Sequence, residues 1–447
     1  MSDSFGAARG IDLSAYVSRV RGMSPCAPEG QVADVVGLIV EVAGVRAATG
    51  ERLEVKMGDG SSLALEVLGF RGGRLLAAPL GPTAGIQPGA RVVKMAHGAS
   101  AEVGEALLGR VIDAFGRPLD DRPAPVLDRH APLVREPPSP FKRQPIHAAL
   151  DTGVRVLDAL LPLGRGQRVG LFAGTGVGKS TLLGMLCRRA RADVVVVALI
   201  GERGREVGDF VRGALGPGLS RSVVIAATGD APPLVRAQGA LRATAVAEHF
   251  RDQGAHVLLV MDSVTRFAMA LREASLAAGE PPVTKGYTPS VFAALPRLLE
   301  RAGNSAGRGS ITAVYTVLVE GDDMQDPIAD AVRGILDGHI VLTRSIAERG
   351  LFPAVDVLRS VSRVIDDITT LNHRRAAAIL RDLMGSHRDA ADLIKIGAYV
   401  RGSDARVDAA IAAMPQIDAL IRQGLDEVST REQSLRAMFT LAKVPPG

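Results

Sequence analysis

Five short runs of apolar, mostly β-branched residues constrain the fold of this chain more than any other feature of its sequence. They are RVGLF, VVVVALI, SVVIAAT, HVLLVMD and SITAVYTVLV, all between Thr152 and Arg363, and none alternates with polar residues. Strands of that composition are buried on both faces, which is typical of parallel strands covered by helices. The segments between the runs carry helical patterns, among them TLLGMLCRRA, PLVRAQGALRATAVAEHFRDQG and SVFAALPRLLERAG. The sequence therefore predicts an α/β domain with a mainly parallel sheet.

The segment from Val32 to Met95 has a different pattern, with short strands separated by turn residues. RLEVKM and LALEV alternate apolar and polar residues on either side of the turn GDGSS, which predicts a hairpin. Further strand patterns lie before it, in VVGLIVEV, and after it, in RLLAAPLG and ARVVKM. Because a closed barrel leaves no unpaired strand edge, we predict a small β-barrel here.

Two further changes of composition divide the chain. Eight prolines between Pro118 and Pro145 remove backbone donors and interrupt helices, which predicts an ordered or semi-rigid connector. After Asn372 the strand patterns stop and Ala- and Leu-rich helix formers follow: HRRAAAILRDLMG, RDAADLIKIGAYVRG, SDARVDAAIAAM and TREQSLRAMFTLA. The predicted parts are an N-terminal arm (1–25), a β-barrel domain (26–97), a connector leading into the α/β domain (98–150), the α/β domain itself (151–370) and a helical C-terminal domain (371–447).

Composition argues against several classes of protein. No apolar run is long enough to span a membrane, and the N-terminus lacks the basic and apolar segments of a secretory signal, so a cytoplasmic protein is expected. The formal net charge of +5 is compatible with a nucleic-acid partner. Aromatic residues make up only 3% of the chain and Trp is absent, which leaves few side chains on which bases could stack. The two cysteines, Cys26 and Cys187, lack the spacing of a metal or redox site, and no disulfide is predicted.

The stretch GLFAGTGVGKSTLL, residues 170–183, follows the first apolar run and opens a helical pattern, which is the setting of a phosphate-binding loop. The glycines of its turn are Gly174, Gly176 and Gly178. They let consecutive backbone N–H groups turn toward a polyanion at a helix N-terminus. We predict that Lys179 contacts the β- and γ-phosphates of a nucleotide and that the Ser180 hydroxyl ligates Mg²⁺. The first position of the pattern is Ala173 rather than glycine, which a negative φ tolerates; the alternative is a glycine-rich turn with an incidental lysine.

Two carboxylates follow other apolar runs, at the carboxyl ends of the predicted strands. Asp262 ends HVLLVMD and is expected to hold the water shell of Mg²⁺, with capping of the next helix as the alternative. Glu202, in GERGRE after VVVVALI, stands where a carboxylate can orient and polarise an attacking water. Spacing alone leaves that role open, and its neighbours Arg203, Arg205 and Glu206 could merely cap and solvate the following helix.

Arg363, in VDVLRSVSRV, lies near the end of the predicted α/β domain and is a candidate for a role in a neighbouring subunit. An arginine so far along the domain could reach a neighbouring subunit's nucleotide and stabilise transition-state charge in trans. The pattern by itself favours the alternative, a surface arginine in an Arg-rich segment.

Several longer segments together resemble the flagellum-specific and type III secretion ATPases, relatives of the catalytic subunits of rotary ATP synthases. They are AGTGVGKS, GERGREV, LLVMDSVTRFAMA, GEPPVTKGYTPSVFAALPRLLERAG, TVLVEGDDMQDPIAD, RGILDGHIVLTR and FPAVDVLRSVSRV, and the resemblance covers nearly the whole chain. It implies an N-terminal β-barrel, a RecA-like P-loop nucleotide domain and a helical C-terminal domain, assembled as a homohexameric ring with ATP sites between subunits. SVTRFAMALRE and KGYTPSVF look more like the flagellar branch than the injectisome branch.

The resemblance also implies roles for residues at matching positions. The catalytic positions are Lys179, Glu202, Arg203 and Arg363. The nucleotide-binding positions are Gly174, Thr175, Gly176, Val177, Gly178, Lys179, Ser180, Thr181, Phe352 and Tyr399. The magnesium positions are Ser180, Glu206 and Asp262. Among these, Glu202 would be the catalytic glutamate and Arg363 the arginine finger in trans, while Phe352 and Tyr399 would face the adenine from two sides; Arg266, in VTRF, matches a further site arginine.

The implied function is Mg²⁺-dependent hydrolysis of ATP that energises export of flagellar proteins through a type III secretion apparatus. An injectisome ATPase is the alternative. A third possibility, an RNA-translocating hexameric ATPase, would need exposed aromatics in the barrel, where Phe70 is the only aromatic residue, and a non-hydrolysing scaffold subunit is disfavoured because Glu202 is present.

The same resemblance implies partners and a location. A stator-like regulator would bind the N-terminal arm, in which Leu13, Tyr16, Val17 and Val20 follow helical spacing; packing of this stripe on its own domain is the alternative. A central stalk protein would act at the pore, near GEPPVTKGYTPSVF, where Lys285 and Tyr287 are candidates. Export-gate proteins and chaperone-bound substrates complete the expected set, with no nucleic acid, and these partners would place the protein in the cytoplasm, peripheral to the inner membrane.

Overall fold

The structure is a computed structural model that describes residues 29–95, 99–319, 321 and 323–446. The helical stripe expected between Leu13 and Val20 lies outside these residues. The chain forms two compact units, one up to Gly98 and one from Ala99 onward. Within the described residues, no helix is both long and apolar enough to cross a membrane.

The first unit contains a closed barrel with the strand order β1-β2-β5-β4-β3-β6. Its strands are β1 (Glu29–Val36), β2 (Ile39–Ala43), β3 (Arg52–Lys56), β4 (Ser62–Arg71), β5 (Arg74–Pro79) and β6 (Arg91–Lys94). The predicted hairpin is the antiparallel pair β3 and β4. The run VVGLIVEV, in contrast, is divided between β1 and β2, because Gly37 turns the chain with a φ of +57°. Alternate residues such as Val40, Val42 and Leu53 fill the interior, and the predicted barrel is confirmed.

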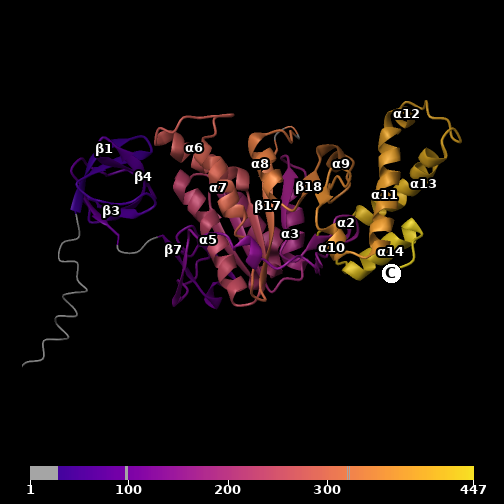
Figure 1. Ribbon diagram of the computed structural model, residues 1–447, viewed down its shortest axis with the longest axis horizontal. Helices are drawn as coiled ribbons and strands as arrows, with labels where there is room; N and C mark the ends of the chain where they lie inside the picture. The colour runs from indigo at the N-terminus through magenta and orange to yellow at the C-terminus, as the bar shows by residue number, and fades with distance from the viewer. Residues whose placement is uncertain (1–28, 96–98, 320, 322, 447) are drawn as a thin grey trace, which may run out of the picture. The chain divides into compact units, whose positions relative to one another are not determined.

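The second unit is built on a sheet with the strand order β19-β18-β12-β17-β15-β13-β14-β8, with β16 paired to β17 (Figure 1). Its strands are β8 (Arg110–Asp113), β12 (Arg168–Ala173), β13 (Val194–Ile200), β14 (Ser222–Ala227), β15 (His256–Asp262), β16 (Gly303–Asn304), β17 (Ser310–Leu318), β18 (Gly338–Leu342) and β19 (Val361–Ser362). Only β16 and β19 pair antiparallel with their neighbours. The five predicted runs are β12, β13, β14, β15 and β17, so the predicted parallel sheet is confirmed.

Helices cover both faces of this sheet. On one face lie α5 (Pro233–Asp252), α6 (Val264–Ala277), α7 (Pro289–Leu299) and α8 (Pro327–Ile335) (Figure 1). On the other face, α2 (Arg155–Leu160) and α3 (Lys179–Arg189) share one apolar core with alternate strand residues such as Val195 and Val197. Both faces of each central strand are thus buried, which is why these strands are apolar throughout.

The segment predicted as a connector has secondary structure of its own. β7 (Ser100–Val103) pairs with β9 (Arg129–Pro132), and β8 is the edge strand of the large sheet. The Arg110 guanidinium on β8 donates to the Asp120 carboxylate at 2.8 Å and to the backbone carbonyl of Pro123 at 2.8 Å. The proline-rich chain is therefore tied to the edge of the sheet rather than left as a free linker.

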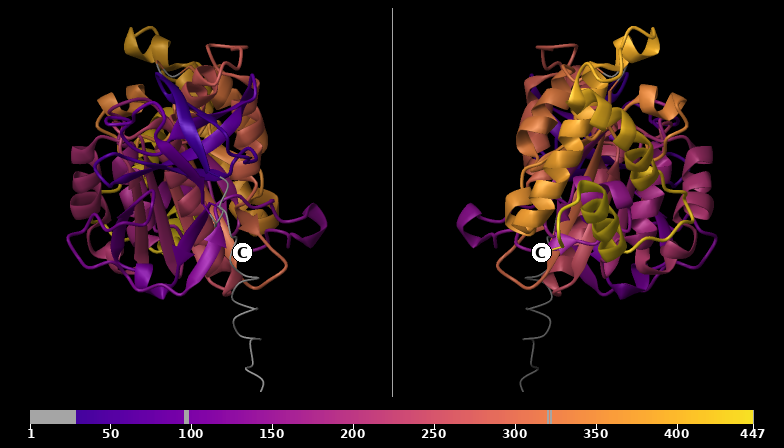
Figure 2. Two further views of the ribbon diagram at one scale, coloured as in Figure 1. Left: turned by 90° about the vertical axis from the view of Figure 1, so that its left-hand side faces the viewer. Right: turned by 90° about the vertical axis from the view of Figure 1, so that its right-hand side faces the viewer.

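The C-terminal helices pack beside the sheet (Figure 2). They are α11 (Leu371–Asp389), α12 (Ala391–Lys395), α13 (Ala405–Ile421) and α14 (Arg431–Ala442). Leu380 and Ile417 join the same apolar core as α2 and α3. Three of the four predicted helical segments are confirmed, and the fourth, RDAADLIKIGAYVRG, is wrong beyond Lys395, because the chain turns at Gly397 with a φ of +72°.

Candidate nucleotide site

The glycine-rich loop lies between β12 and α3, at the carboxyl edge of the sheet. Strand β12 ends at Ala173 and α3 begins at Lys179. Gly176 and Gly178 have φ values of +78° and +88°, in the left-handed region that glycine adopts without strain. Ala173 is not among the described non-glycine residues with positive φ, so its methyl group fits the loop.

The loop offers a row of donors to an anion. Among the described residues, the backbone N–H groups of 174–178 donate to no protein acceptor. The N-terminal turn of α3 follows directly and adds its own free N–H groups and positive potential. Unsatisfied donors of this kind match the oxygens of a nucleotide's phosphates.

Lys179, the first residue of α3, reaches across to the neighbouring strand end. Its ammonium group lies 2.6 Å from a carboxylate oxygen of Asp262 and 3.7 Å from one of Glu202. Asp262 is only 3% exposed and also accepts a hydrogen bond of 2.7 Å from the Thr316 hydroxyl. The fold thus brings the predicted lysine and both predicted carboxylates together from β12, β13 and β15.

Glu202 has an environment suited to proton transfer. Burial, a hydrogen bond with Glu206 and the negative charge of Asp262 raise the pKa of Glu202 to about 7, against the opposing charge of Lys179. The hydrogen bond with Glu202 lowers the pKa of Glu206, which lies in α4 (Gly204–Asp209). A carboxylate with a pKa near neutrality can take a proton from water at physiological pH.

The residues present also fit Mg²⁺. Ser180 lies in the first turn of α3, Asp262 ends β15 beside Lys179, and Glu206 lies in α4, where it hydrogen-bonds with Glu202. Magnesium prefers oxygen ligands and keeps several waters, so one hydroxyl and one or two carboxylates beside a phosphate loop suffice.

A cavity of about 450 Å³ opens over the outer side of the loop, lined by Gly174, Thr175 and Val177. Two arginines also line it. Arg266, in α6, has a buried Nε atom without a hydrogen-bond partner. Arg344 begins α9 (Arg344–Glu348) and was missed by the sequence analysis, although LTR follows the apolar strand β18 just as the other site residues follow their strands.

Of the two aromatic residues expected beside adenine, the structure brings only one to the loop. A Cβ atom at Gly178 would lie 3.3 Å from the ring of Phe352, so this half-exposed ring packs against the start of α3. Tyr399 lies between α12 and α13, and its hydroxyl donates to Asp404 and Asp408 in that segment, each at 3.0 Å. The structure does not bring Tyr399 to the phosphate loop.

The two expected catalytic arginines are both exposed. The Arg203 side chain is 88% exposed and lies 3.6 Å from the carboxylate of Glu206. Arg363 is exposed and follows β19, whose Ser362 pairs with Gly338 at the start of β18. The phosphate loop instead adjoins the far end of β18, where Leu342 pairs with Ala173. Four residues of strand span about 13 Å, so the geometry keeps Arg363 out of the site in its own subunit.

The pore candidates differ in exposure. Lys285 is exposed and lies 3.7 and 3.5 Å from the carboxylates of Asp323 and Asp326. Tyr287 is buried beneath the Arg272 guanidinium, 5.0 Å from the ring centre. Tyr287 therefore packs inside the subunit rather than presenting its ring to a partner.

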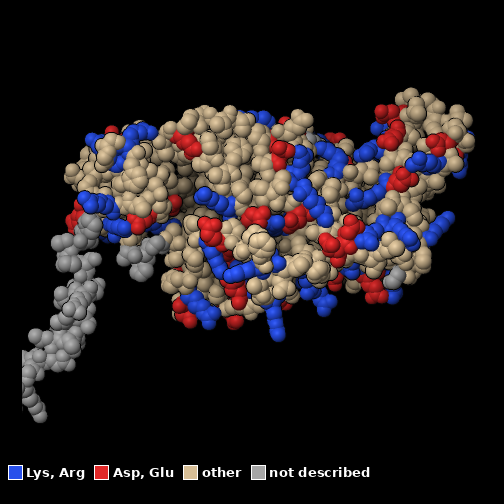
Figure 3. Space-filling model, viewed as in Figure 1, with Lys and Arg blue, Asp and Glu red and all other residues tan. Residues whose placement is uncertain are grey.

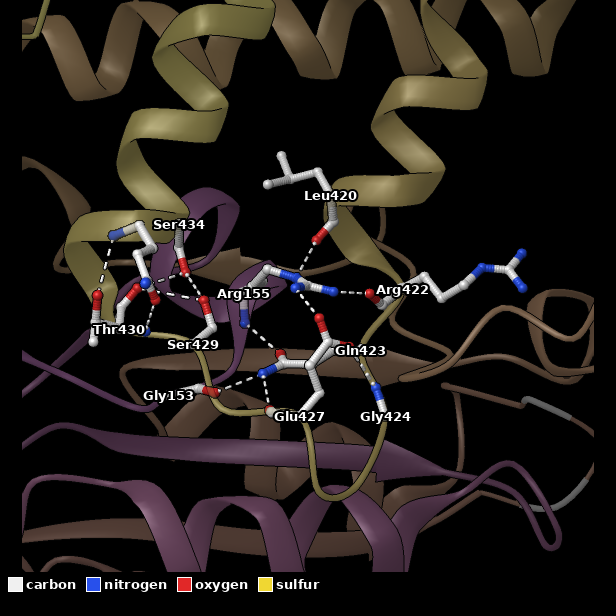
Figure 4. A network of polar contacts seen from close by, with 11 residues as sticks. Gly153, Arg155, Leu420, Arg422, Gln423, Gly424, Glu427, Ser429, Thr430 and Ser434 are labelled. Atoms are coloured by element: carbon white, nitrogen blue, oxygen red, sulfur yellow. Dashed lines mark hydrogen bonds and ion pairs between the residues drawn. The ribbon is translucent and has the colours of Figure 1, made fainter.

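A C-terminal loop, residues 422–429, contacts Phe352, the start of α2 and the end of α3, and Figure 4 shows its contacts with Gly153 and Arg155. The backbone N–H of Gln423 donates to the carbonyl of Phe352 at 2.9 Å. The Gln423 side-chain oxygen accepts from the backbone N–H of Arg155 at 2.8 Å, and its amide nitrogen donates to the carbonyls of Gly153 and Glu427 at 3.0 and 2.9 Å. From the end of α3, Arg188 pairs with Asp426 at 3.2 Å. The helical part is thus anchored to α2, to the end of α3 and to Phe352, of which Phe352 lies beside the phosphate loop.

The fold and the site define a class: a phosphate loop at the carboxyl edge of a parallel sheet, with a lysine and two carboxylates converging on it, belongs to a P-loop nucleotide-binding protein. Comparison with known proteins agrees. Residues 153–362 match the nucleotide-binding domain of the ATP synthase alpha/beta family and residues 32–95 its beta-barrel domain. Residues 369–440 match the type III secretion system EscN ATPase C-terminal domain.

Similar proteins extend the match to nearly the whole chain. The flagellum-specific ATP synthase of Salmonella typhimurium is 52% identical, over 92% of each chain. The type 3 secretion system ATPase of Xanthomonas euvesicatoria is 48% identical, over 92% of this chain and 93% of its own. The assembled ATPase EscN of enteropathogenic E. coli, in complex with its central stalk EscO, superposes with a TM-score of 0.85 at 44% identity, over 92% of this chain and 100% of its own. The chain belongs to the flagellar and type III secretion ATPases of the ATP synthase alpha/beta family, and it is an ATPase.

Proposed function

We propose that this chain hydrolyses ATP in a homohexameric ring and so energises export of flagellar proteins through a type III secretion apparatus. The observation that carries the proposal is the convergence of Lys179, Glu202 and Asp262 on the phosphate loop. The flagellar assignment is supported by the 52% identity to a flagellum-specific relative over nearly the full length of both chains.

Each residue of the site has a proposed task. The loop amides and Lys179 hold the β- and γ-phosphates, and Phe352 lies against the adenine. Glu202 orients a water molecule and accepts its proton while the new phosphorus–oxygen bond forms and the bond to ADP breaks. Mg²⁺, held by Ser180, Asp262 and Glu206, would neutralise phosphate charge when bound.

Arg363 is proposed to act in the site of a neighbouring subunit. Its exposure, and its position at the opposite end of β18 from its own phosphate loop, support a role in trans. There its guanidinium would stabilise the charge that develops on the γ-phosphoryl group. Arg203, equally exposed, is proposed to reach the same border between subunits.

The partners and the location follow from this assignment. A stator-like regulator is proposed at the N-terminal arm (1–25), and a stalk protein at the pore by analogy with the EscN–EscO complex. Export-gate proteins and chaperone-bound substrates would hold the ring at the inner membrane from the cytoplasmic side. We propose no nucleic-acid partner, because Lys and Arg are interspersed with Asp and Glu on the face drawn in Figure 3 and form no continuous basic stripe there.

The test replaces the gene in its own cells by one encoding Glu202→Gln. Flagellin and hook protein are expected to disappear from the culture medium, while the protein itself accumulates normally. The second candidate, an injectisome ATPase, is favoured by the 48% identity to the Xanthomonas protein. Normal flagellar secretion together with loss of injected effectors would decide for that candidate.

A further inference from the structure

A second cavity, of about 420 Å³, lies far from the nucleotide site. It is bordered by the first residues of β15 and β17, His256 and Ser310, which pair with each other at the amino edge of the sheet. The phosphate loop lies at the opposite, carboxyl edge. Six residues along β15 separate the two edges, which corresponds to about 20 Å.

The ionisable side chains that line this cavity are all basic. Arg165, Arg308, His147 and His256 line it, and no Asp or Glu does so among the described residues. The Nε atom of Arg165 is buried without a hydrogen-bond partner, and neither arginine forms an ion pair within the described part of the chain. Asp193 does accept a hydrogen bond of 2.7 Å from the backbone N–H of His256, but its carboxylate does not line the cavity.

The loop that closes the cavity also has unsatisfied donors. The backbone N–H groups of residues 305–309 donate to no protein acceptor among the residues described. Both ends of the loop are fixed, because the Asn304 amide donates to the carbonyls of Gln144 and Pro145 at 3.1 Å and Ser310 N donates to Ala255 O at 3.1 Å. Donors left unpaired in a fixed loop are the usual setting of an anion site.

The number of donors indicates which anion. Two guanidinium groups, two imidazoles and a run of amides exceed what the two oxygens of a carboxylate can accept. A phosphate monoester presents three terminal oxygens, and a lipid phosphodiester presents two terminal and two bridging oxygens; like a carboxylate, either can pair with arginine in a bidentate manner, but each has more oxygens to accept the remaining donors. The volume exceeds that of a bare phosphate, so there is room for a substituent on one oxygen.

We propose that the cavity bounded by Arg165, His147, His256 and the loop 304–310 binds a phosphate-bearing anion, a phosphate monoester or a lipid phosphate headgroup. The site is separate from ATP hydrolysis and does not depend on the flagellar assignment. A ligand there would bridge the connector, through His147, to the amino ends of the central strands.

The experiment uses the full-length protein with its nucleotide sites filled by Mg²⁺ and a non-hydrolysable ATP analogue. Inorganic phosphate is titrated and followed by ³¹P line broadening, at constant ionic strength. We expect saturable binding that weakens about tenfold or more in Arg165→Gln and in Arg308→Gln. The matched control is Arg401→Gln, an exposed arginine between α12 and α13. Retained ATPase activity shows that each variant is folded.

A second arm separates the two sources of phosphate. Flotation with phosphatidylglycerol vesicles, against phosphatidylcholine vesicles, tests the headgroup in the same variants. Binding of either probe that depends on Arg165 and Arg308 supports the site, and the probe that binds shows whether the phosphate comes from a free anion or from a lipid headgroup. Binding of neither probe, or binding that Arg165→Gln and Arg308→Gln leave unchanged, overturns the proposal.

Discussion

At the scale of single residues, Lys179 and Glu202 differ in what their loss should remove. Lys179→Ala deletes the charge that faces the phosphates, so nucleotide binding is expected to be lost. Glu202→Gln keeps the shape of the site but cannot accept a proton, so binding should persist while turnover falls by about 10²- to 10⁴-fold. Fluorescent-nucleotide titration and phosphate release measure the two effects separately. Near wild-type turnover in Glu202→Gln would remove this residue from its assigned role.

Arg344 provides a second prediction at this scale, because it lines the cavity over the phosphate loop. Arg344→Ala is expected to raise KM for ATP about tenfold with a smaller change in kcat, since it removes a charge from the binding surface. Arg359→Ala, in an exposed position outside the cavity, is the control. Equal KM values for the two variants would show that Arg344 does not contact the nucleotide.

At the scale of elements, the loop 422–429 connects the helical part to the nucleotide site. Gln423 is 3% exposed, and its amide makes three hydrogen bonds. Gln423→Ala leaves buried backbone groups unpaired and should lower the free energy of unfolding by about 2 kcal/mol. The backbone N–H at position 423, which bonds Phe352, is kept in this variant, but a loop no longer held by the Gln423 side chain positions Phe352 less firmly, so a rise in KM is expected as well. Arg422→Ala is the control, since its side chain points away from the network in Figure 4; a thermal melt of both variants decides.

The docking of α11 should depend on pH through His373. This histidine is 2% exposed, and its Nε2 lies 2.8 Å from the carbonyl of Ala159, to which it donates. Burial lowers the pKa of His373 below its usual 6.5. Below that pH the unfolded chain binds a proton that the folded chain resists, so the free energy of unfolding falls as the pH drops from about 7 to 5. His373→Gln should flatten this part of the stability curve, measured by urea unfolding; an unchanged slope would assign the pH dependence to another group.

Secondary structure could be predicted wherever a run was long. The five apolar runs and the helices α3, α5 and α7 have clear patterns over several residues. Two more parallel strands of the sheet were not among the five: β8 has only four residues, and β18 needs the sheet around it to be recognised. The helix expected through RDAADLIKIGAYVRG stops early because Gly397 takes a left-handed conformation, which a composition favourable to helix does not reveal.

At the scale of the whole molecule, the separation between Arg363 and its own phosphate loop predicts complementation. Arg363→Ala and Glu202→Gln are each expected to be inactive alone. Mixed in one ring, they form some interfaces in which both residues are intact, so part of the ATPase activity should return. The control mixes Glu202→Gln with Lys179→Ala. Both residues belong to the same subunit's site, so every site in the mixed ring still lacks one of them and no activity should return. No recovery in rings shown to contain both Arg363→Ala and Glu202→Gln subunits would contradict action in trans.

The sequence by itself determined the chemical groups of this protein and their order along the chain. Lys179, Glu202 and Asp262 could be predicted because parallel strands bring their carboxyl ends to one edge, so a residue that follows an apolar run must lie there. Only the tertiary structure decided which of the remaining residues share that edge. It brought Arg344 and Phe352 to the loop, left Tyr399 in the C-terminal segment and placed Arg363 at the far end of β18, because strand order and register depend on contacts between residues distant in sequence.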